Sequence, residues 1–393
     1  MSLRAIPRTV WALGFVSMLM DVSSEMVHAF LPVFLVSTLG ASMSLVGLIE
    51  GIGEGAASVT KLFSGAISDW FGRRKQLAVV GYSLGALTKP VFALAVTPLE
   101  VLAARFVDRV GKGIRGAPRD ALVADVTPAA VRGTAYGVRQ ALDTVGALAG
   151  PAAAIVLVAG FHVDLRGVFA VAIGPGLLAV VLLVLGVEEP RESAAPSAGR
   201  ERLRARDLGG LAAPFWVAVA VGAVFALARF SEAFLVLRGR EVGLPLAWVP
   251  AVMIAMNLVY AFVATPAGAL SDRVDRRLVL ASGFAALIAS DLVLARFGSA
   301  AGALAGAGLW GLHMGVTQGL LAALVADTAP AALRGTAFGL FNLVSGASTF
   351  LASVVAGVLW QRFGSVATFL VGATLTGVAL VGLLARVWRR PAR

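Results

Sequence analysis

Apolar runs long enough to cross a lipid bilayer recur along almost the whole chain, and this feature limits the possible folds most strongly. A helix needs roughly 20 apolar residues to span the hydrocarbon core. Hydrophobic residues make up 59% of the 393 residues and charged residues only 14%, whereas soluble domains carry about 25% charged residues. Soluble cores could not bury this apolar surplus. The sequence therefore predicts an all-α integral membrane protein.

Breaking these runs at charge clusters and at Gly/Pro turns predicts twelve membrane-spanning helices. They lie near residues 10–38, 43–68, 77–96, 99–126, 131–159, 166–187, 212–236, 246–270, 278–296, 300–325, 334–360 and 366–387. Arg4 and Arg8 precede the first run, as in a signal peptide. The run nevertheless continues to Leu39 without a small-residue cleavage site, so we expect it to be the first spanning helix.

Lysines and arginines are distributed unevenly between the predicted loops. With the N-terminus in the cytoplasm, 19 of them lie on the cytoplasmic side and 5 on the outer side. Positive loops stay inside, so we expect a plasma (inner) membrane protein with both termini in the cytoplasm. Attraction to anionic lipid explains most of the net charge of +11, which therefore does not indicate nucleic-acid binding.

The two halves of the chain repeat one another. The block ALVADVTPAAVRGTAYG at 121–137 matches ALVADTAPAALRGTAFG at 323–339 in 13 of 17 positions, with an offset of 202. A second pair of blocks, Gly65–Asp69 and Gly268–Asp272, has an offset of 203. Such repeats indicate duplication. We therefore expect two six-helix halves, 1–187 and 211–393, joined by a polar cytoplasmic linker at 188–210.

Three motifs stand out within this frame. The first is the loop after the second span, with its copy in the second half: Gly65, Asp69, Gly72, Arg73 and Arg74, then Gly268, Asp272 and Arg276. The second lies in segment 131–159 and contains Gly137, Gly146, Gly150 and Pro151. The third begins at Arg105 in segment 99–126 and reads R-F-V-D-R.

These motifs resemble the signatures of transporters of the major facilitator superfamily (MFS). The loop is similar to G-x-x-x-D-R-x-G-R-R/K, although Trp70 replaces a basic residue and Asp275 replaces a glycine in the second copy. The resemblance implies a cytoplasmic gate latch in which the aspartate caps a neighbouring helix. The alternative is an arginine cluster that serves only membrane topology.

The glycine motif resembles the MFS antiporter signature g-x8-G-x3-G-P-x2-G-G, with Ala154 and Ile155 in place of its last glycine pair. This resemblance implies export. Small residues allow close helix contact, and we expect this face to meet the other half; ordinary helix packing is the alternative. The third motif resembles R-x-x-Q-G, but Asp108 and Arg109 replace its last two residues.

Charged residues inside the predicted spans are costly in lipid and are functional candidates by default. Asp21, Glu25 and His28 share one helical face, since they are spaced i, i+4, i+7. Most such charges lie in the first half, although Asp291 lies in the second. The candidates for proton coupling or substrate binding are Asp21, Glu25, Glu50, Glu54, Arg105, Asp108, Arg109, Lys112, Arg139, Asp143, Arg229 and Glu232.

A purely structural role is the alternative for these charges, because opposite charges neutralise each other in pairs. The local spacing suggests three pairs: Asp143 with Arg139, Asp108 with Lys112, and Glu232 with Arg229. Lys89 is either an ion-pair partner or a side chain that reaches towards the interface. A carboxylate that is protonated in a low-dielectric cavity would release its cation partner, which makes Asp21 and Glu25 candidates for a proton switch.

No enzyme motif is present, and we expect no catalysis and no cofactor. A chain without cysteine and with three histidines is unsuited to a soft-metal site, so none is predicted. We expect a monomer that moves a small solute by alternating access, driven by protons and directed outward, of the drug- or toxic-compound-efflux type. The alternatives are an importer of a polar or anionic metabolite, an exporter of a metal cation, and a membrane scaffold that transports nothing.

Overall fold

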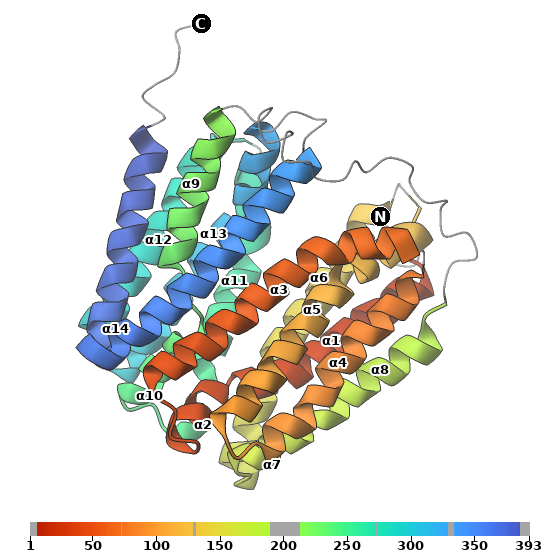
Figure 1. Cartoon of the computed structure of the whole chain (residues 1–393), viewed down its shortest axis with the longest axis horizontal. Helices are drawn as coiled ribbons and strands as arrows, with labels where there is room; N and C mark the ends of the chain where they lie inside the picture. The colour runs from red at the N-terminus through yellow and green to blue at the C-terminus, as the bar shows by residue number, and fades with distance from the viewer. Residues whose placement is uncertain are drawn as a thin grey trace, which may run out of the picture. The chain divides into compact units, whose positions relative to one another are not determined.

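The computed structural model describes residues 6–71, 73–128, 131–188, 213–271, 273–328 and 334–385, and these residues are almost entirely helical. The described part contains no β-strand. Its helices, labelled in Figure 1, are α1 (Arg8–His28), α2 (Leu31–Ser37), α3 (Met43–Phe71), α4 (Arg74–Leu94), α5 (Pro98–Val126), α6 (Arg132–Ile155), α7 (Leu165–Val171), α8 (Ile173–Gly186), α9 (Ala213–Ala228), α10 (Ala233–Glu241), α11 (Ala251–Ser271), α12 (Arg276–Arg296), α13 (Ala300–Thr328) and α14 (Arg334–Ala385).

A helix or a consecutive pair of helices lies at each of the twelve predicted spans. Eight helical stretches of the described residues are long and apolar enough to cross a membrane by length and composition. One of these, Ala337–Ala385, contains 49 residues, and α14 is interrupted at Gly364, where φ is 81°. This left-handed conformation suits glycine. The all-helical membrane fold is confirmed, and twelve separate crossings remain a prediction.

Local signals explain several helix ends. At the start of α5, the Thr97 hydroxyl accepts a hydrogen bond from the Glu100 backbone N–H, and the Glu100 carboxylate accepts one from the Thr97 N–H in return. This reciprocal capping satisfies donors that have no partner inside the helix. Asp164 caps α7 in a similar way by accepting from the Gly167 N–H. The turns between spans are therefore encoded locally.

The described residues fall into two compact units. The first lies within Met1–Gly40 and Ile52–Glu201, and the second within Ala41–Gly51 and Arg202–Arg393. Helix α3 contributes its first turns to the second unit and the rest to the first. Most of the predicted linker at 188–210 lies outside the described residues, so the predicted domain boundaries remain a prediction.

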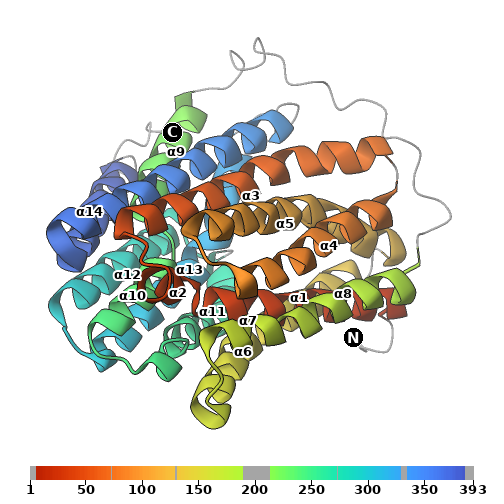
Figure 2. The same cartoon turned by 60° about the horizontal axis from the view of Figure 1, so that its bottom comes forward.

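Each unit has its own apolar core. In the first unit, side chains of α1, α4, α5, α6 and α8 pack together, and Val10, Met20 and Tyr82 lie at the centre. Helices α4 and α5 run side by side in this unit (Figure 2). In the second unit, Phe215, Val325 and Phe341 bring α9, α13 and α14 together.

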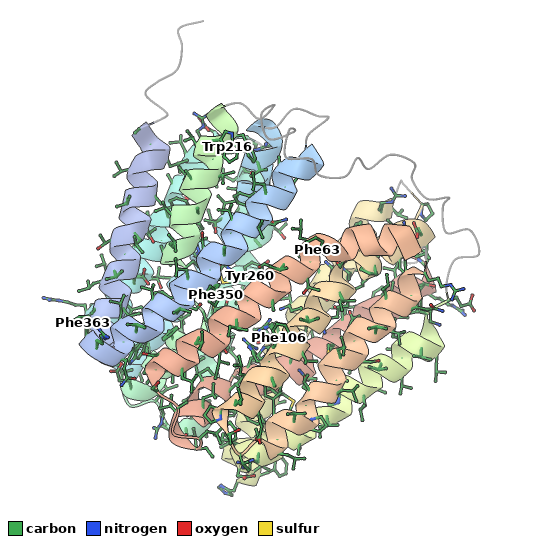
Figure 3. The ribbon with its side chains drawn as sticks, in the orientation of Figure 1. Phe63, Phe106, Trp216, Tyr260, Phe350 and Phe363 are labelled. Carbon is green, nitrogen blue, oxygen red and sulfur yellow. The ribbon has the colours of Figure 1, made fainter. Side chains whose placement is uncertain are left out.

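Large apolar side chains also cover the outside of the helices. Phe63 of α3, Trp216 of α9 and Phe363 of α14 are 56%, 42% and 68% exposed (Figure 3). Exposed apolar surface of this extent is unfavourable in water and marks an interaction surface. On helices with this composition, lipid is the solvent that such side chains suit.

Candidate functional site

A lysine and an aspartate form the centre of a polar network inside the first unit. Lys89 of α4 is fully buried, and Asp108 of α5 is 2% exposed. The Lys89 ammonium donates a hydrogen bond of 2.8 Å to Asp108 Oδ1 and one of 3.1 Å to the Ser24 hydroxyl of α1. Because both charges are removed from solvent, each depends on the other for stabilisation.

This pair corrects one prediction from spacing. Asp108 binds Lys89 on the neighbouring helix and not Lys112, which lies one turn away on α5. Lys112 is instead exposed. Lys89 is an ion-pair partner and does not reach towards the interface. The residues around Lys89 in the sequence do not indicate that its partner is Asp108, because that partner lies on another helix.

The acidic face of α1 approaches this pair through a histidine. His28 Nε2 lies 3.8 Å from Asp108 Oδ2, and His28 Nδ1 lies 3.5 Å from Glu25 Oε1. Both distances are too long for strong hydrogen bonds, and they become ion pairs only if the imidazole is protonated. Glu25 and His28 of the predicted common face therefore lie beside the Lys89–Asp108 pair.

Helix α5 carries a row of cations beside this network. Arg105 and Arg109 are 4% and 6% exposed, and their side chains pack against Gly53 of α3. The Arg109 guanidinium lies 3.5 Å from the Glu54 carboxylate, so the structure brings these two candidates together. Arg115 lies over the Tyr82 ring, with its guanidinium carbon 4.8 Å from the ring centroid. Such an arrangement can hold an anion or exchange carboxylate partners.

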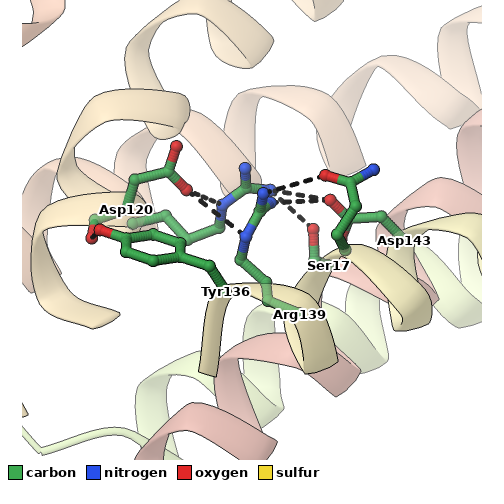
Figure 4. Close-up of polar contacts among 7 residues, drawn as sticks. Ser17, Asp120, Tyr136, Arg139 and Asp143 are labelled. Atoms are coloured by element: carbon green, nitrogen blue, oxygen red, sulfur yellow. Dashed lines mark hydrogen bonds and ion pairs between the residues drawn. The ribbon is translucent and has the colours of Figure 1, made fainter. Parts of the chain in front are cut away.

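A second polar cluster joins α1, α5 and α6 (Figure 4). Arg139 donates a hydrogen bond of 2.7 Å to Asp143 Oδ2, which is the pair expected from their i, i+4 spacing. Arg119 donates to the Ser17 hydroxyl at 2.7 Å and to Asp120 Oδ1 at 3.1 Å. Arg139 and Asp143 therefore belong to a network that also contains Arg119. Arg119 is not among the candidate residues predicted from the sequence.

The glycine motif of α6 packs against α1 in the same unit. A Cβ atom on Gly146 would lie 2.6 Å from the Met18 carbonyl oxygen, and one on Gly150 would lie 2.8 Å from Glu25 Cβ. The expectation that these two glycines meet the other half is therefore wrong. Gly137 has open space around it, and Pro151 is buried within α6. The motif brings α6 directly against the helix that carries Asp21 and Glu25.

Only part of the predicted gate loop can be located. Gly72, Asp272 and the side chain of Asp69 lie outside the described residues. Arg73 precedes α4, and Arg74 forms an ion pair with Asp125 near the end of α5. In the second half, the Gly268 carbonyl accepts from Ser271, and Arg276 begins α12. The latch itself remains a prediction.

The candidates of the second unit lie around a break between two helices. Helix α9 ends at Ala228 and α10 begins at Ala233, so Arg229 and Glu232 occupy the irregular segment between them. Glu50, which is 2% exposed, accepts a hydrogen bond of 2.9 Å from the Ser231 hydroxyl in this segment. Glu50 therefore belongs with the second unit, and Glu54 with the first.

No group of three or more His, Cys, Asp or Glu side chains that could hold a metal ion occurs among the described residues. Glu54, Asp108 and Asp143 each lie within 3.5 Å of a cationic side chain.

The sequence matches the family model described as the Major Facilitator Superfamily over residues 13–353. The chain belongs to the major facilitator superfamily. An uncharacterised MFS-type transporter of Methanocaldococcus jannaschii is 30% identical over 391 residues, covering 97% of this chain and 95% of the relative. An uncharacterised protein of Mycobacterium bovis is 29% identical over 369 residues, covering 90% of this chain and 87% of that protein.

Solved MFS structures have the same fold. A crystal structure of the nucleoside transporter NupG has a TM-score of 0.80 at 14% identity, covering 96% of this MFS chain and 99% of that one. A bacterial homologue of the human lysosomal transporter Spinster has a TM-score of 0.78 at 14% identity, covering 99% of this chain and 98% of that one. At these identities the similarity shows the fold alone. The chain is an MFS transporter, and its solute has to be inferred from its own residues.

Proposed function

We propose that this transporter is a proton-coupled exporter of a small organic solute, of the drug- or toxic-compound-efflux type, that works by alternating access. The observation that carries the proposal is the network in which Glu25, His28, Asp108 and Lys89 follow one another across α1, α4 and α5. Ionisable side chains in a membrane interior are costly, and they are therefore candidates for a role in transport.

This network has the parts of a proton switch. Asp21 and Glu25 are partly exposed, while Asp108 is buried against Lys89. His28 lies between two carboxylates, 3.5 Å from Glu25 and 3.8 Å from Asp108, so protonation of Glu25 changes the contact that His28 makes on one side while Asp108 stays on the other. A change in carboxylate charge is thereby passed to α4 and α5. Alternating access needs such a link between proton binding and helix packing.

Broken helices supply a site for the solute. The first span is interrupted between His28 and Leu31, and the equivalent span of the second half between Ala228 and Ala233. Discontinuous helices near the bilayer midplane form substrate sites in many transporters, because their unwound backbone leaves polar groups for a ligand. The break in the first unit lies beside the Glu25–His28 contact.

Export is favoured by the glycine motif of α6, which resembles an antiporter signature and packs on the proton-switch helix through Gly146 and Gly150. One specific observation favours a second candidate, the import of an anionic metabolite. The cations Arg105 and Arg109 are buried side by side against Gly53 and could bind a carboxylate or phosphate.

Purified full-length protein in proteoliposomes tests the proposal. Vesicles with an imposed pH gradient are screened with fluorescent cationic drugs and with radiolabelled organic acids. Proton-coupled export predicts drug movement against the proton flow that stops when an ionophore collapses the gradient. Anion import predicts movement of an organic acid with the protons. No flux of any solute under any gradient would support a scaffold and refute both transport proposals.

A deletion strain provides the independent test of direction. Loss of an exporter increases sensitivity to a toxic compound and raises its concentration in the cell. Loss of an importer instead reduces uptake of a nutrient and slows growth on it. We also propose a monomer in the plasma membrane. The 19-to-5 distribution of basic residues supports an orientation with both termini in the cytoplasm.

A further inference from the structure

The internal repeat relates two buried positions that differ in charge. Helices α4 (Arg74–Leu94) and α12 (Arg276–Arg296) differ by 202 at both ends, and so do α5 (Pro98–Val126) and α13 (Ala300–Thr328). This offset is the one found for the repeated 17-residue block. Asp291 of α12 therefore occupies the position of Lys89, and Trp310 of α13 occupies the position of Asp108.

The ion pair of the first unit has no counterpart at these positions. Lys89 and Asp108 neutralise each other at 2.8 Å. In the second unit, Asp291 has an exposed fraction of 0%, and both of its carboxylate oxygens are buried without a hydrogen-bond partner in the described part of the chain. The indole Nε1 of Trp310 is likewise buried without a partner there. Duplication has therefore left a carboxyl group where its repeat has a lysine.

Apolar packing closes around this carboxyl group. A Cβ atom on Gly372 of α14 would lie 2.7 Å from Asp291 Oδ2 and 3.2 Å from the Phe230 ring. The Phe230 ring lies 5.4 Å from the Trp310 ring and 5.7 Å from the Phe369 ring, measured between centroids. Helix α14 thus approaches Asp291 so closely that no side chain fits at Gly372. Neither carboxylate oxygen of Asp291 accepts a hydrogen bond from any of the residues that the structure describes.

The charged groups on the surrounding elements have other contacts or lie elsewhere. Arg238 of α10 donates to the Leu294 carbonyl of α12, to Ser365 and to Glu241. His313 of α13 contacts the Gly283 carbonyl, eight residues from Asp291 along α12. Arg362 of α14 is exposed, α11 contains no charged residue, and Arg229 and Glu232 lie between α9 and α10. None of these groups forms an ion pair with Asp291 in the described part.

We propose that Asp291 is a proton-binding site of the second unit and holds its proton in the conformation described. An ionised carboxylate that is fully buried, with no cation or hydrogen-bond donor beside it among the described residues, is far costlier than a neutral carboxyl group, so the proton stays bound. Opening of this packing to water during the transport cycle would release it. The release step rests on the proton coupling proposed above, whereas occupation of the site does not.

Infrared spectroscopy of the full-length protein in lipid tests occupation directly. A protonated carboxyl group has a carbonyl stretching band that is absent from a carboxylate, and we expect this band in the wild type at neutral pH. We expect Asp291→Asn to remove the band. The control is Asp108→Asn, which alters the ion-paired aspartate of the first unit and should leave the band in place. Persistence of an unchanged band in Asp291→Asn would overturn the proposal.

A measurement without substitutions guards against misfolding of the variants. Growth with isotopically labelled aspartate shifts every aspartic-acid carbonyl band of the wild type and leaves glutamic-acid bands in place. A shifted band is the expected result, and the absence of an aspartic-acid band at neutral pH would overturn the proposal. Either spectrum is independent of flux, so failure of the proton site is distinguishable from failure of proton-coupled transport.

Discussion

Lys89 of α4 and Asp108 of α5 form a 2.8 Å ion pair from which solvent is almost completely excluded. Removing one member of a buried pair strands the other charge and typically costs about 3–5 kcal/mol, whereas replacing both with apolar side chains can be neutral. The pair therefore offers a test of whether this network is structural, coupled to transport, or both.

We expect Lys89→Met and Asp108→Leu each to lower the free energy of unfolding by about 3–5 kcal/mol, and the double variant to lower it by much less than their sum. Thermal and denaturant unfolding in detergent measures this. If the two single effects simply add, the two charges do not stabilise each other. A double variant that is stable but cannot transport would assign the pair to the transport cycle.

We expect Asp21→Asn and Glu25→Gln to fold normally and to lose proton-driven flux, because neither variant can change charge on α1. Both side chains are partly exposed, so an isosteric amide should cost less stability than a change in the buried Lys89–Asp108 pair. Flux under a pH gradient is compared with gradient-independent solute exchange, which should persist. Full proton-driven flux in both variants would show that neither carboxylate carries the coupling proton.

Gly150→Ala should reduce stability by about 1–3 kcal/mol, the usual cost of overpacking. Its methyl group would lie 2.8 Å from both Glu25 Cβ and the Val22 carbonyl oxygen, and would push α6 away from α1. Gly137→Ala is the matched control on the same helix, since nothing lies within 4 Å of the added carbon. We expect the control to be neutral or stabilising by about 0.5–1 kcal/mol. Equal effects at both positions would contradict the packing argument.

The absence of cysteine makes each introduced cysteine unique in this chain. Ser299→Cys, between α12 and α13, should react with an impermeant maleimide added to intact cells. Ser193→Cys, in the predicted linker, should react only after the membrane is permeabilised. Mass shift on a gel measures both. The opposite pattern would reverse the predicted orientation of the whole chain.

The fold was predictable because its main determinant is a local property. Whether a stretch of roughly 20 residues suits lipid depends on its own side chains, and the repeat at an offset of 202 is visible without any structure. Contacts that follow helical periodicity were predictable for the same reason. The face shared by Asp21, Glu25 and His28 and the Arg139–Asp143 pair, one turn apart on α6, are of this kind.

The sequence by itself thus determined an all-helical membrane protein, its repeat and the residues that carry charge into the bilayer. Only the tertiary structure decided which of those charges meet. Lys112 lies one turn from Asp108, yet the packing of α4 on α5 selects Lys89, nineteen residues away. The same packing in the second unit leaves Asp291 without a partner among the described residues. An ion pair depends on distance in space, and helix packing sets that distance through side chains far apart in the chain.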